Sequence, residues 1–284
     1  MLVERPFRIV NAAGDLIRGD FRYLDDGLLK PLVLVCHGFN TNKDWGPFPY
    51  LGKRLAEAGF CTYVFNFSHN GVGDDSAVFS EYDRFSKNTP GKELDDVQTI
   101  LNAFAAGDPG GGIVDVKRIG MAGHSRGGGI SVLTAAGDTR VKSVVAWSTI
   151  SAFLRYTPEE REGWVRRGYL PLRYGSTRTL LRYEVSVLYD LEENKERYDL
   201  LNGVRRLKVP TLFIHGSGDE IVSPDEARSL YDASDKTLTK FVLLEGAGHT
   251  YGVEHPFTGT TRETEVLLEQ TKSWFHKTLT EEAR

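Results

Sequence analysis

The sequence predicts an α/β fold with a mostly parallel sheet, helices on both faces, an antiparallel hairpin at the N-terminus and an inserted helical cap. Three observations predict it. Short apolar runs alternate with amphipathic stretches along most of the chain. The 284 residues, 40% of them hydrophobic, suffice for one such unit. Residues 150–208 break the alternation and show no clear strand pattern.

The N-terminal half gives the first elements. Residues 7–10 and 15–24 flank a turn rich in small residues, which predicts the hairpin. Residues 32–36 are continuously apolar, as in a strand buried on both faces. The remaining strands of the sheet are predicted at 61–67, 116–122, 141–148, 210–215 and 238–244.

Helices are predicted between these strands. Residues 92–106 carry apolar side chains at the i, i+3, i+4 spacing of one helix face. Ser223-Pro224 followed by Glu226 has the composition of a helix start. Further helices are predicted at 48–58, 126–136 and from 260 to about 278, and a long polar loop at 68–90. Because strands alternate with helices, parallel pairing through right-handed crossovers is expected.

We expect one core, formed by residues 1–149 and 209–284, and a cap or lid at 150–208. The cap is rich in aromatic and arginine side chains: Phe153, Tyr156, Trp164, Tyr169, Tyr174, Tyr183, Tyr189, Tyr198, Arg155, Arg161, Arg166, Arg167, Arg173, Arg178 and Arg182. One or two of these could line a substrate pocket, where an arginine would meet an anionic group. We expect most of them to pack the lid, with the arginines paired to Glu159, Glu160, Glu162 and Glu184.

Composition excludes several classes of protein. The formal net charge of -4 lacks the broad positive field that nucleic-acid binding needs. No stretch reaches the roughly 18 apolar residues of a membrane span. The first five residues lack the apolar core of a secretion signal, so we expect a cytoplasmic location. Cys36 and Cys61 fall near opposite ends of neighbouring predicted strands and are expected to be unbridged.

The motif that carries chemistry is Gly123-His124-Ser125-Arg126-Gly127, which follows a predicted strand and precedes a predicted helix. A serine nucleophile must project from a very tight strand-to-helix turn, and glycines two residues before and after leave room for that turn. The helix N-terminus then directs free amides at the reacting oxygen. Ser125 is therefore the candidate nucleophile.

A serine nucleophile needs a base and a carboxylate, expected in the chain order Ser, Asp or Glu, His. Asp219 follows the strand at 210–215, and His249 follows the strand at 238–244. Both therefore fall at the sheet edge where open α/β folds build their sites. Glu220 remains an alternative acid and His255 an alternative base.

Other groups complete the expected site. His124 is expected to point away from the serine and make a structural contact. A developing oxyanion needs two preorganised amides, and we expect them to be the N–H groups of Phe39 and Arg126.

The chain resembles the α/β-hydrolase superfamily over nearly its whole length. Three stretches resemble small carboxylesterases of the cinnamoyl/feruloyl esterase and dienelactone-hydrolase-like group. They are His37-Gly38-Phe39 with the segment at 55–60, Phe65-Asn66-Phe67 before a Gly-x-Gly loop, and the motif around Ser125. The resemblance implies the α/β-hydrolase fold and acyl-ester hydrolysis by Ser125, Asp219 and His249. Serine at position 125 separates the chain from branches that use aspartate or cysteine there.

We therefore expect a serine carboxylesterase that acts on small or aromatic acyl esters and needs no cofactor or metal. A peptidase or amidase of the same fold is the alternative enzyme, and a non-catalytic binding module is the alternative outside catalysis. The expected partner is a small-molecule ester. Neither nucleic acid nor a membrane span is expected, and a homodimer is left open.

Overall fold

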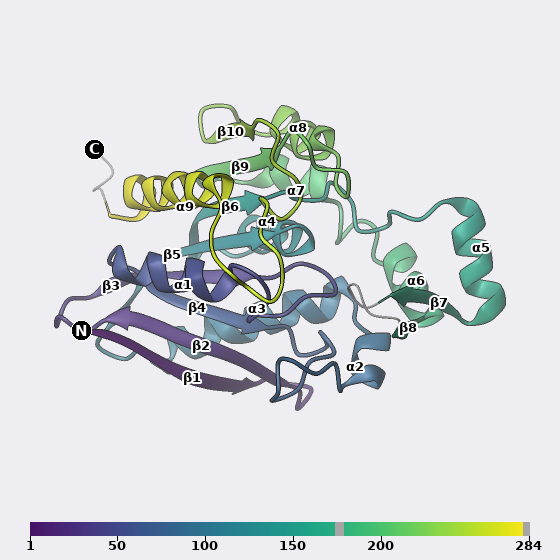
Figure 1. The fold of residues 1–284 in the computed structure, drawn as a ribbon, viewed down its shortest axis with the longest axis horizontal. Coiled ribbons are helices and arrows are strands. Elements are labelled where there is room, and N and C mark those ends of the chain that lie inside the picture. Colours follow the sequence, from purple (N-terminus) through teal and green to yellow (C-terminus); the bar gives the residue numbers. More distant parts are fainter. Residues whose placement is uncertain (174–178, 281–284) are drawn as a thin grey trace.

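The computed structural model describes residues 1–173 and 179–280, and eight strands of these residues form one sheet (Figure 1). The order across the sheet is β1-β2-β4-β3-β5-β6-β9-β10. The strands are β1 (Leu2–Val10), β2 (Leu16–Leu24), β3 (Lys30–Cys36), β4 (Cys61–Asn66), β5 (Val114–His124), β6 (Val141–Trp147), β9 (Thr211–Gly216) and β10 (Thr239–Leu244). From β4 to β10 all neighbours are parallel, whereas β2 pairs antiparallel with both β1 and β4. The predicted hairpin and mostly parallel sheet are confirmed.

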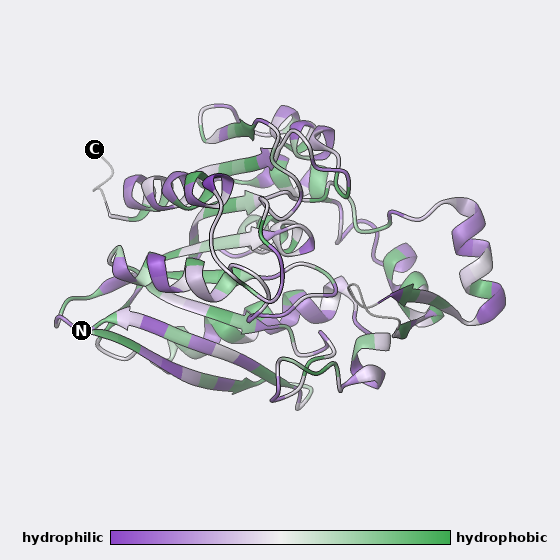
Figure 2. Ribbon diagram, in the orientation of Figure 1, coloured by the Kyte–Doolittle hydropathy of each residue, from purple (hydrophilic) through white to green (hydrophobic). Residues whose placement is uncertain are grey.

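Helices cover both faces of the sheet, as Figure 1 shows. The helices are α1 (Phe48–Glu57), α3 (Pro90–Ala105), α4 (Arg126–Gly137), α8 (Pro224–Ala233) and α9 (Arg262–Phe275). Leu55 of α1 and Leu268 of α9 belong to one buried apolar cluster, and Ile100 of α3 and Ile130 of α4 belong to another. In Figure 2 the central strands are largely green beneath a mostly purple α9. The sheet is therefore apolar on both faces, as its continuous apolar runs predict.

The segment after β6 forms a cap that projects from one end of the sheet (Figure 1). It contains α5 (Pro158–Arg167), β7 (Tyr169–Arg173), β8 (Leu180–Glu184) and α6 (Val185–Glu193). The strands β7 and β8 pair antiparallel, so the expectation that this segment holds no strand was wrong. Each strand has only five residues with alternating burial, and exposed Pro171 and arginines hide that period in the sequence. The last helix before β9, α7 (Leu200–Arg206), packs against α4 and α8.

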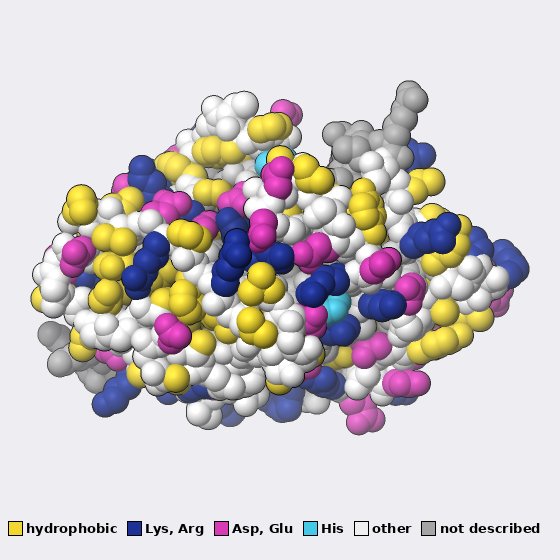
Figure 3. Space-filling view, turned by 90° about the horizontal axis from the view of Figure 1, so that it is seen from below, with side chains coloured by type: hydrophobic (Ala, Val, Ile, Leu, Met, Phe, Trp, Pro, Cys, Tyr) yellow, Lys and Arg dark blue, Asp and Glu magenta, His cyan; other side chains and the backbone are white. Residues whose placement is uncertain are grey.

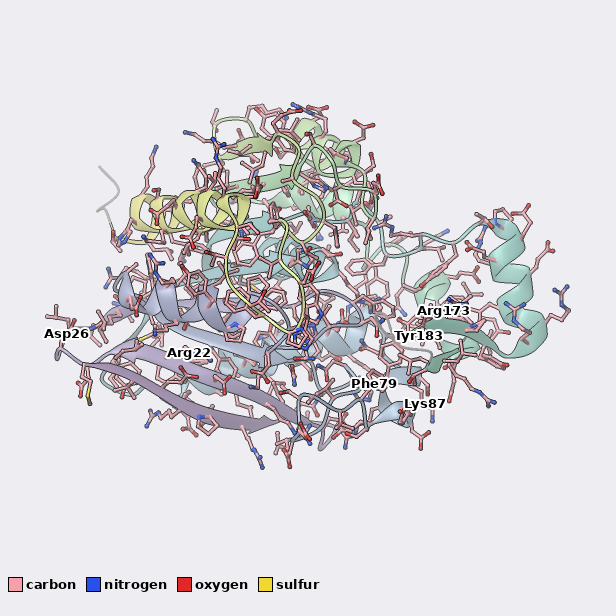
Figure 4. The ribbon with its side chains drawn as sticks, in the orientation of Figure 1. Arg22, Asp26, Phe79, Lys87, Arg173 and Tyr183 are labelled. Atoms are coloured by element: carbon pink, nitrogen blue, oxygen red, sulfur yellow. The ribbon has the colours of Figure 1, made fainter. Side chains whose placement is uncertain are left out.

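The cap rests on the core through aromatic side chains. Tyr183 of β8 is fully buried and stacks on Trp164 of α5 with ring centroids 5.4 Å apart. Its hydroxyl donates a hydrogen bond to the carbonyl oxygen of Asn88, at 2.6 Å. Figure 4 places Tyr183 on the side of the cap that faces the core. Tyr174 and Arg178, also expected in the cap, lie outside the described residues.

Residues 68–90 are not entirely a loop. They contain a short helix, α2 (Tyr82–Ser86), and an isolated bridge between Val72 and Phe79. Phe79 and Phe85 form a small buried cluster with Leu181 of the cap. The prediction of a loop missed this helix because five residues are too few to show a helical period.

The charge of the surface and the state of the two cysteines agree with what the composition predicts. Figure 3 shows basic and acidic side chains interspersed over one face of the molecule. Among the described residues, none of the helices combines the length and the apolar character that a membrane crossing requires. Cys36 and Cys61 are both free and buried, as expected.

A buried carboxylate on α3 makes the stability of the fold depend on pH. Asp96 is fully buried and accepts hydrogen bonds from the backbone N–H of Ser68 and the side-chain amide of Asn11. Burial outweighs these hydrogen bonds and raises the pKa of Asp96 to about 6. An unfolded aspartate has a pKa of about 3.9. Between these two values the folded state holds the proton that the unfolded state has lost, so stability falls as the pH rises.

We therefore expect the contribution of Asp96 to the free energy of unfolding to decline as the pH rises from about 4 to about 6. Asp96→Asn is expected to remove this part of the pH dependence. The measurement is urea unfolding of both proteins at several pH values. The matched control is Asp95→Asn. Asp95 is the preceding residue on the same helix, but its side chain is mostly exposed beside Arg197. Equal pH slopes for the wild type and Asp96→Asn would contradict the assignment.

Candidate active site

Ser125 occupies a strained turn between β5 and α4. Its φ is 54° and its ψ is -119°, in a region that non-glycine residues seldom adopt. The Ser125 N–H donates to the carbonyl oxygen of Trp147 at the end of β6, at 2.8 Å. Ser125 is partly exposed while its neighbours in the motif are buried. The turn therefore presents this side chain at the carboxyl edge of the sheet.

The glycines of the motif permit this turn. A Cβ on Gly127 would collide with the carbonyl oxygens of Cys36 and His37 at the end of β3. A Cβ on Gly123 would collide with the backbone of Gly127 itself. The start of α4 can therefore lie against β3 only because both positions lack a side chain.

Asp219 and His249 meet at the same edge. The Nδ1 of His249 lies 2.8 Å from Oδ2 of Asp219, a hydrogen bond between the loops that follow β10 and β9. The Asp219 side chain is fully buried and that of His249 is 12% exposed. The carboxylate is therefore shielded from solvent while the imidazole is accessible, and the hydrogen bond favours the tautomer with the proton on Nδ1.

Asp219 has more partners than the sequence indicated. Its Oδ1 accepts hydrogen bonds from the N–H groups of Ile221 and Val222, and His215 Nε2 lies 3.1 Å from its Oδ2. Burial raises the pKa of Asp219, but the hydrogen bonds from His215, His249 and the Val222 N–H outweigh burial and leave the pKa below its ordinary value. The carboxylate is therefore held ionised, with two histidines on one oxygen.

The alternative acid and the alternative base do not take part in this hydrogen bond. Glu220 is exposed, and the hydrogen bond of His249 goes to Asp219. His255 stacks on Trp45 and accepts a hydrogen bond from the Gly46 N–H. His124 donates through Nε2 to the carbonyl oxygen of His249, at 2.9 Å, so the expected structural contact is confirmed.

Ser125 and His249 line one cavity of about 400 Å³. The other lining residues are Gly38, Phe39, Asn40, Thr41, Trp45, His124, Arg126, Ile150, Phe153, Arg155, Tyr156, Ile221, Val222 and Thr250. Among the described residues, neither Ser125 Oγ nor His249 Nε2 makes a hydrogen bond. Such contacts are often long in unliganded sites and tighten when substrate binds.

Two backbone amides, unpaired in the described part of the chain, belong to segments that meet at Ser125. The turn after β3 approaches the serine closely, since a Cβ built on Gly38 would lie 3.3 Å from Ser125 Cβ. The N–H groups of Phe39 and Arg126 have no hydrogen-bond partner within the described residues. They are therefore available to an oxygen atom in the cavity.

The burial of the Arg126 side chain, next to Ser125, was not anticipated from the sequence. The Nε of Arg126 donates to Oε2 of Glu93 at 2.7 Å, and both side chains are more than nine-tenths buried. The sequence does carry a signal for this pair. Glu93 lies on the apolar stripe of α3 with Val97, Ile100 and Phe104, and an acidic residue in such a stripe indicates a buried cation.

Two cap side chains reach the cavity as aromatic lining, Phe153 and Tyr156. Arg155 also lines it, but its Nη2 lies 2.6 Å from Oε1 of Glu226 on α8. The cap arginines do not take the expected glutamate partners in the described residues: Arg155 pairs with Glu226 and Arg161 with Glu192.

Within residues 1–173 and 179–280, no group of three or more His, Cys, Asp or Glu side chains is arranged to hold a metal ion.

The chain is similar to known proteins in sequence and structure. The family model described as the alpha/beta hydrolase family matches residues 32–262. An Escherichia coli protein, the uncharacterized 31.7 kDa protein in the traX-finO intergenic region, is 23% identical over 75% of this chain and 81% of its own length. Est1E from Butyrivibrio proteoclasticus, solved with ferulic acid bound, superposes with a TM-score of 0.73 at 19% identity, covering 97% of this chain and 100% of that one.

A peptidase gives a comparable superposition. The acylaminoacyl peptidase of Pyrococcus horikoshii has a TM-score of 0.70 at 19% identity, covering 100% of this chain and 42% of that one. At such identities the structural likeness shows the fold alone.

The glycine packing yields a matched pair of variants. Gly127→Ala must displace the backbone of β3 and is expected to destabilise the protein by about 3 kcal/mol or more. Gly137→Ala, at the other end of α4, meets nothing within 4 Å and is expected to be neutral or stabilising because alanine favours the helix. Thermal unfolding measures both, and equal melting temperatures would contradict the role of Gly127.

Proposed function

The chain belongs to the alpha/beta hydrolase family, and from this premise we propose that it is a serine carboxylesterase acting on small or aromatic acyl esters through an acyl-enzyme intermediate. The observation that carries the proposal is the hydrogen bond of 2.8 Å between His249 Nδ1 and Asp219, at the wall of the cavity that Ser125 lines from its strained turn. Three side chains from three separate loops would then act together.

In the proposed reaction, His249 Nε2 removes the Ser125 proton as Oγ attacks the ester carbonyl carbon. His249 then gives this proton to the leaving alcohol oxygen, and an acyl-enzyme remains. Water attacks the acyl carbon with His249 again as the base, and Ser125 leaves protonated. Asp219 holds the imidazole in the correct tautomer and stabilises its charged form.

The oxyanion of each tetrahedral intermediate would be stabilised by the N–H groups of Phe39 and Arg126. Both lack a partner within the described residues, and both belong to segments that meet at Ser125. Donors fixed in place by the backbone need no reorganisation when the negative charge develops. Each is expected to contribute about 3 kcal/mol to the transition state.

The cavity favours an ester over the alternatives. Its volume of about 400 Å³ lies in the range of small-molecule sites, and its walls are mainly aromatic and aliphatic. A peptidase would need room for chain on both sides of the scissile bond. A binding module would not require a buried carboxylate held ionised beside an accessible imidazole. Both alternatives remain outcomes of the experiments below.

Ser125→Ala is expected to abolish labelling by a fluorophosphonate probe and to lower kcat for p-nitrophenyl acetate by about 10⁴-fold or more, because the variant lacks the hydroxyl that would form the acyl-enzyme. Ser234→Ala, at the end of α8 and outside the cavity, is the control. An Ser125→Ala protein that keeps the wild-type rate would remove the nucleophile assignment. A wild type that no probe labels would favour a binding module.

Asp219→Asn is expected to lower kcat by up to about 10⁴-fold, since the amide can hold the wrong imidazole tautomer. Glu220→Gln is the matched control, since Glu220 is the neighbouring exposed acid. A larger loss in Glu220→Gln than in Asp219→Asn would reverse the assignment of the acid. Faster turnover of an aminoacyl anilide than of a short acyl ester would instead favour a peptidase.

A further inference from the structure

The Arg126 side chain is a buried polar group that the proposed mechanism does not use. Only the N–H of its backbone enters the mechanism. The side chain is 9% exposed and lines the catalytic cavity beside Phe39, Phe153 and Tyr156. A charged side chain at such a position requires a reason, because its burial is costly unless its donors are paired.

The donors of Arg126 are only partly paired. A guanidinium has five N–H groups in a planar fork. Nε donates to Glu93 at 2.7 Å and Nη1 donates to the hydroxyl of Tyr183 at a long 3.4 Å. Nη2 is buried and has no hydrogen-bond partner within the described residues. Buried donors without a partner are uncommon in folded proteins and mark a place where another group belongs.

The surroundings hold the guanidinium in place. Its central carbon lies 5.1 Å from the ring centre of Phe39 and 5.6 Å from that of Phe153. Glu93 is itself fixed, since its other oxygen accepts a hydrogen bond from the side-chain amide of Asn88 at 2.8 Å. The side chain is therefore held in one position, and Nη2 is fixed in the wall of the cavity without a partner within the described residues.

The local charge determines which ligand suits these donors. The carboxylate of Glu93 already balances the charge of Arg126, and Glu226 balances that of Arg155. An anionic ligand would bring a second negative group close to Glu93. A neutral oxygen acceptor gains the hydrogen bond without that repulsion.

We propose that the Arg126 side chain forms an acyl subsite that selects acyl groups carrying a neutral oxygen acceptor, a carbonyl or a hydroxyl, over plain hydrocarbon chains. The leaving alcohol must lie beside His249, which protonates it. None of the contacts made by the Arg126 side chain within the described residues is with His249. The subsite therefore belongs to the acyl side, and the inference rests on the proposed esterase function.

The first experiment uses the unmodified protein. The values of kcat/KM for p-nitrophenyl 4-oxopentanoate and 5-oxohexanoate are compared with those for the pentanoate and hexanoate esters, each divided by its rate of alkaline hydrolysis. A hydrogen bond to a charged donor predicts a preference of about tenfold or more for at least one oxo ester. Equal or faster hydrolysis of both hydrocarbon esters would overturn the subsite, and so would a preference for the adipate half-ester, which ends in a carboxylate.

A second experiment removes the donors. The variant carries Arg126→Met together with Glu93→Gln, because Arg126→Met alone would leave a buried carboxylate unpaired. The oxo-to-hydrocarbon ratio, taken within each protein, is expected to fall to about one. Arg197→Met is the control, since Arg197 pairs with Asp95 at the surface outside the cavity, and its ratio should equal that of the wild type. A wild-type ratio retained in the double variant would overturn the role of Arg126.

The two proposals fail in different ways. A wild type that hydrolyses acetate and reacts with a fluorophosphonate probe, yet shows no oxo preference, would overturn the subsite and leave the esterase function standing. A wild type that neither reacts with the probe nor hydrolyses any of the esters would overturn the esterase function, and the subsite with it.

Discussion

Ser125 adopts a positive φ because Gly123 and Gly127 let the start of α4 lie in direct contact with the end of β3. That contact has two consequences. It projects the serine hydroxyl beyond the sheet, and it brings the turn at Phe39 beside the first amide of α4. The same backbone packing thus sets the position of the candidate nucleophile and of both candidate oxyanion donors. A change that loosens it would displace all three together.

The positions of Asp219 and His249 depend on the sheet rather than on that turn. Asp219 and His249 follow adjacent parallel strands, β9 and β10, so their loops start at the same edge. The carboxylate is fixed by two amides on one oxygen and two histidines on the other. Since both oxygens are fully used, the carboxylate cannot rotate, and the imidazole plane of His249 is set by the core of the protein. His249 then lines the cavity with its Nδ1 held by Asp219.

The positions of the three candidate site residues can be predicted from the sequence because the patterns that predict them are local. Ser125, Asp219 and His249 were each placed by chain order and by a preceding predicted strand, at 116–122, 210–215 and 238–244. Parallel strands end at one edge whatever the details of packing. The cap was less predictable. The period of β7 and β8 is carried by Leu170, Leu172, Leu181 and Tyr183, which is too short a pattern to distinguish from an irregular segment.

The contacts of the Arg126 side chain could not be predicted from the sequence, for a different reason. Position 126 was predicted to contribute only its backbone N–H. Arginine side chains were predicted to contact a ligand only in the cap. Its direction depends on Glu93, 33 residues earlier, and on Tyr183, 57 residues later. A motif of five residues contains neither partner. Glu93, the acidic residue within the apolar stripe of α3, indicates that a cation is buried beside it. The pattern does not identify which basic residue this is.

These contacts make Arg126 a link between the turn at Ser125 and the cap. Its backbone begins α4 beside Ser125, while its guanidinium reaches Glu93 on α3 and the hydroxyl of Tyr183 on β8. That hydroxyl also donates to Asn88, and Asn88 in turn holds Glu93. The four residues form one closed set of hydrogen bonds, joining α4, α3 and the cap. A change at any one of these four residues would therefore affect the cap through Tyr183 and the start of α4 through Arg126.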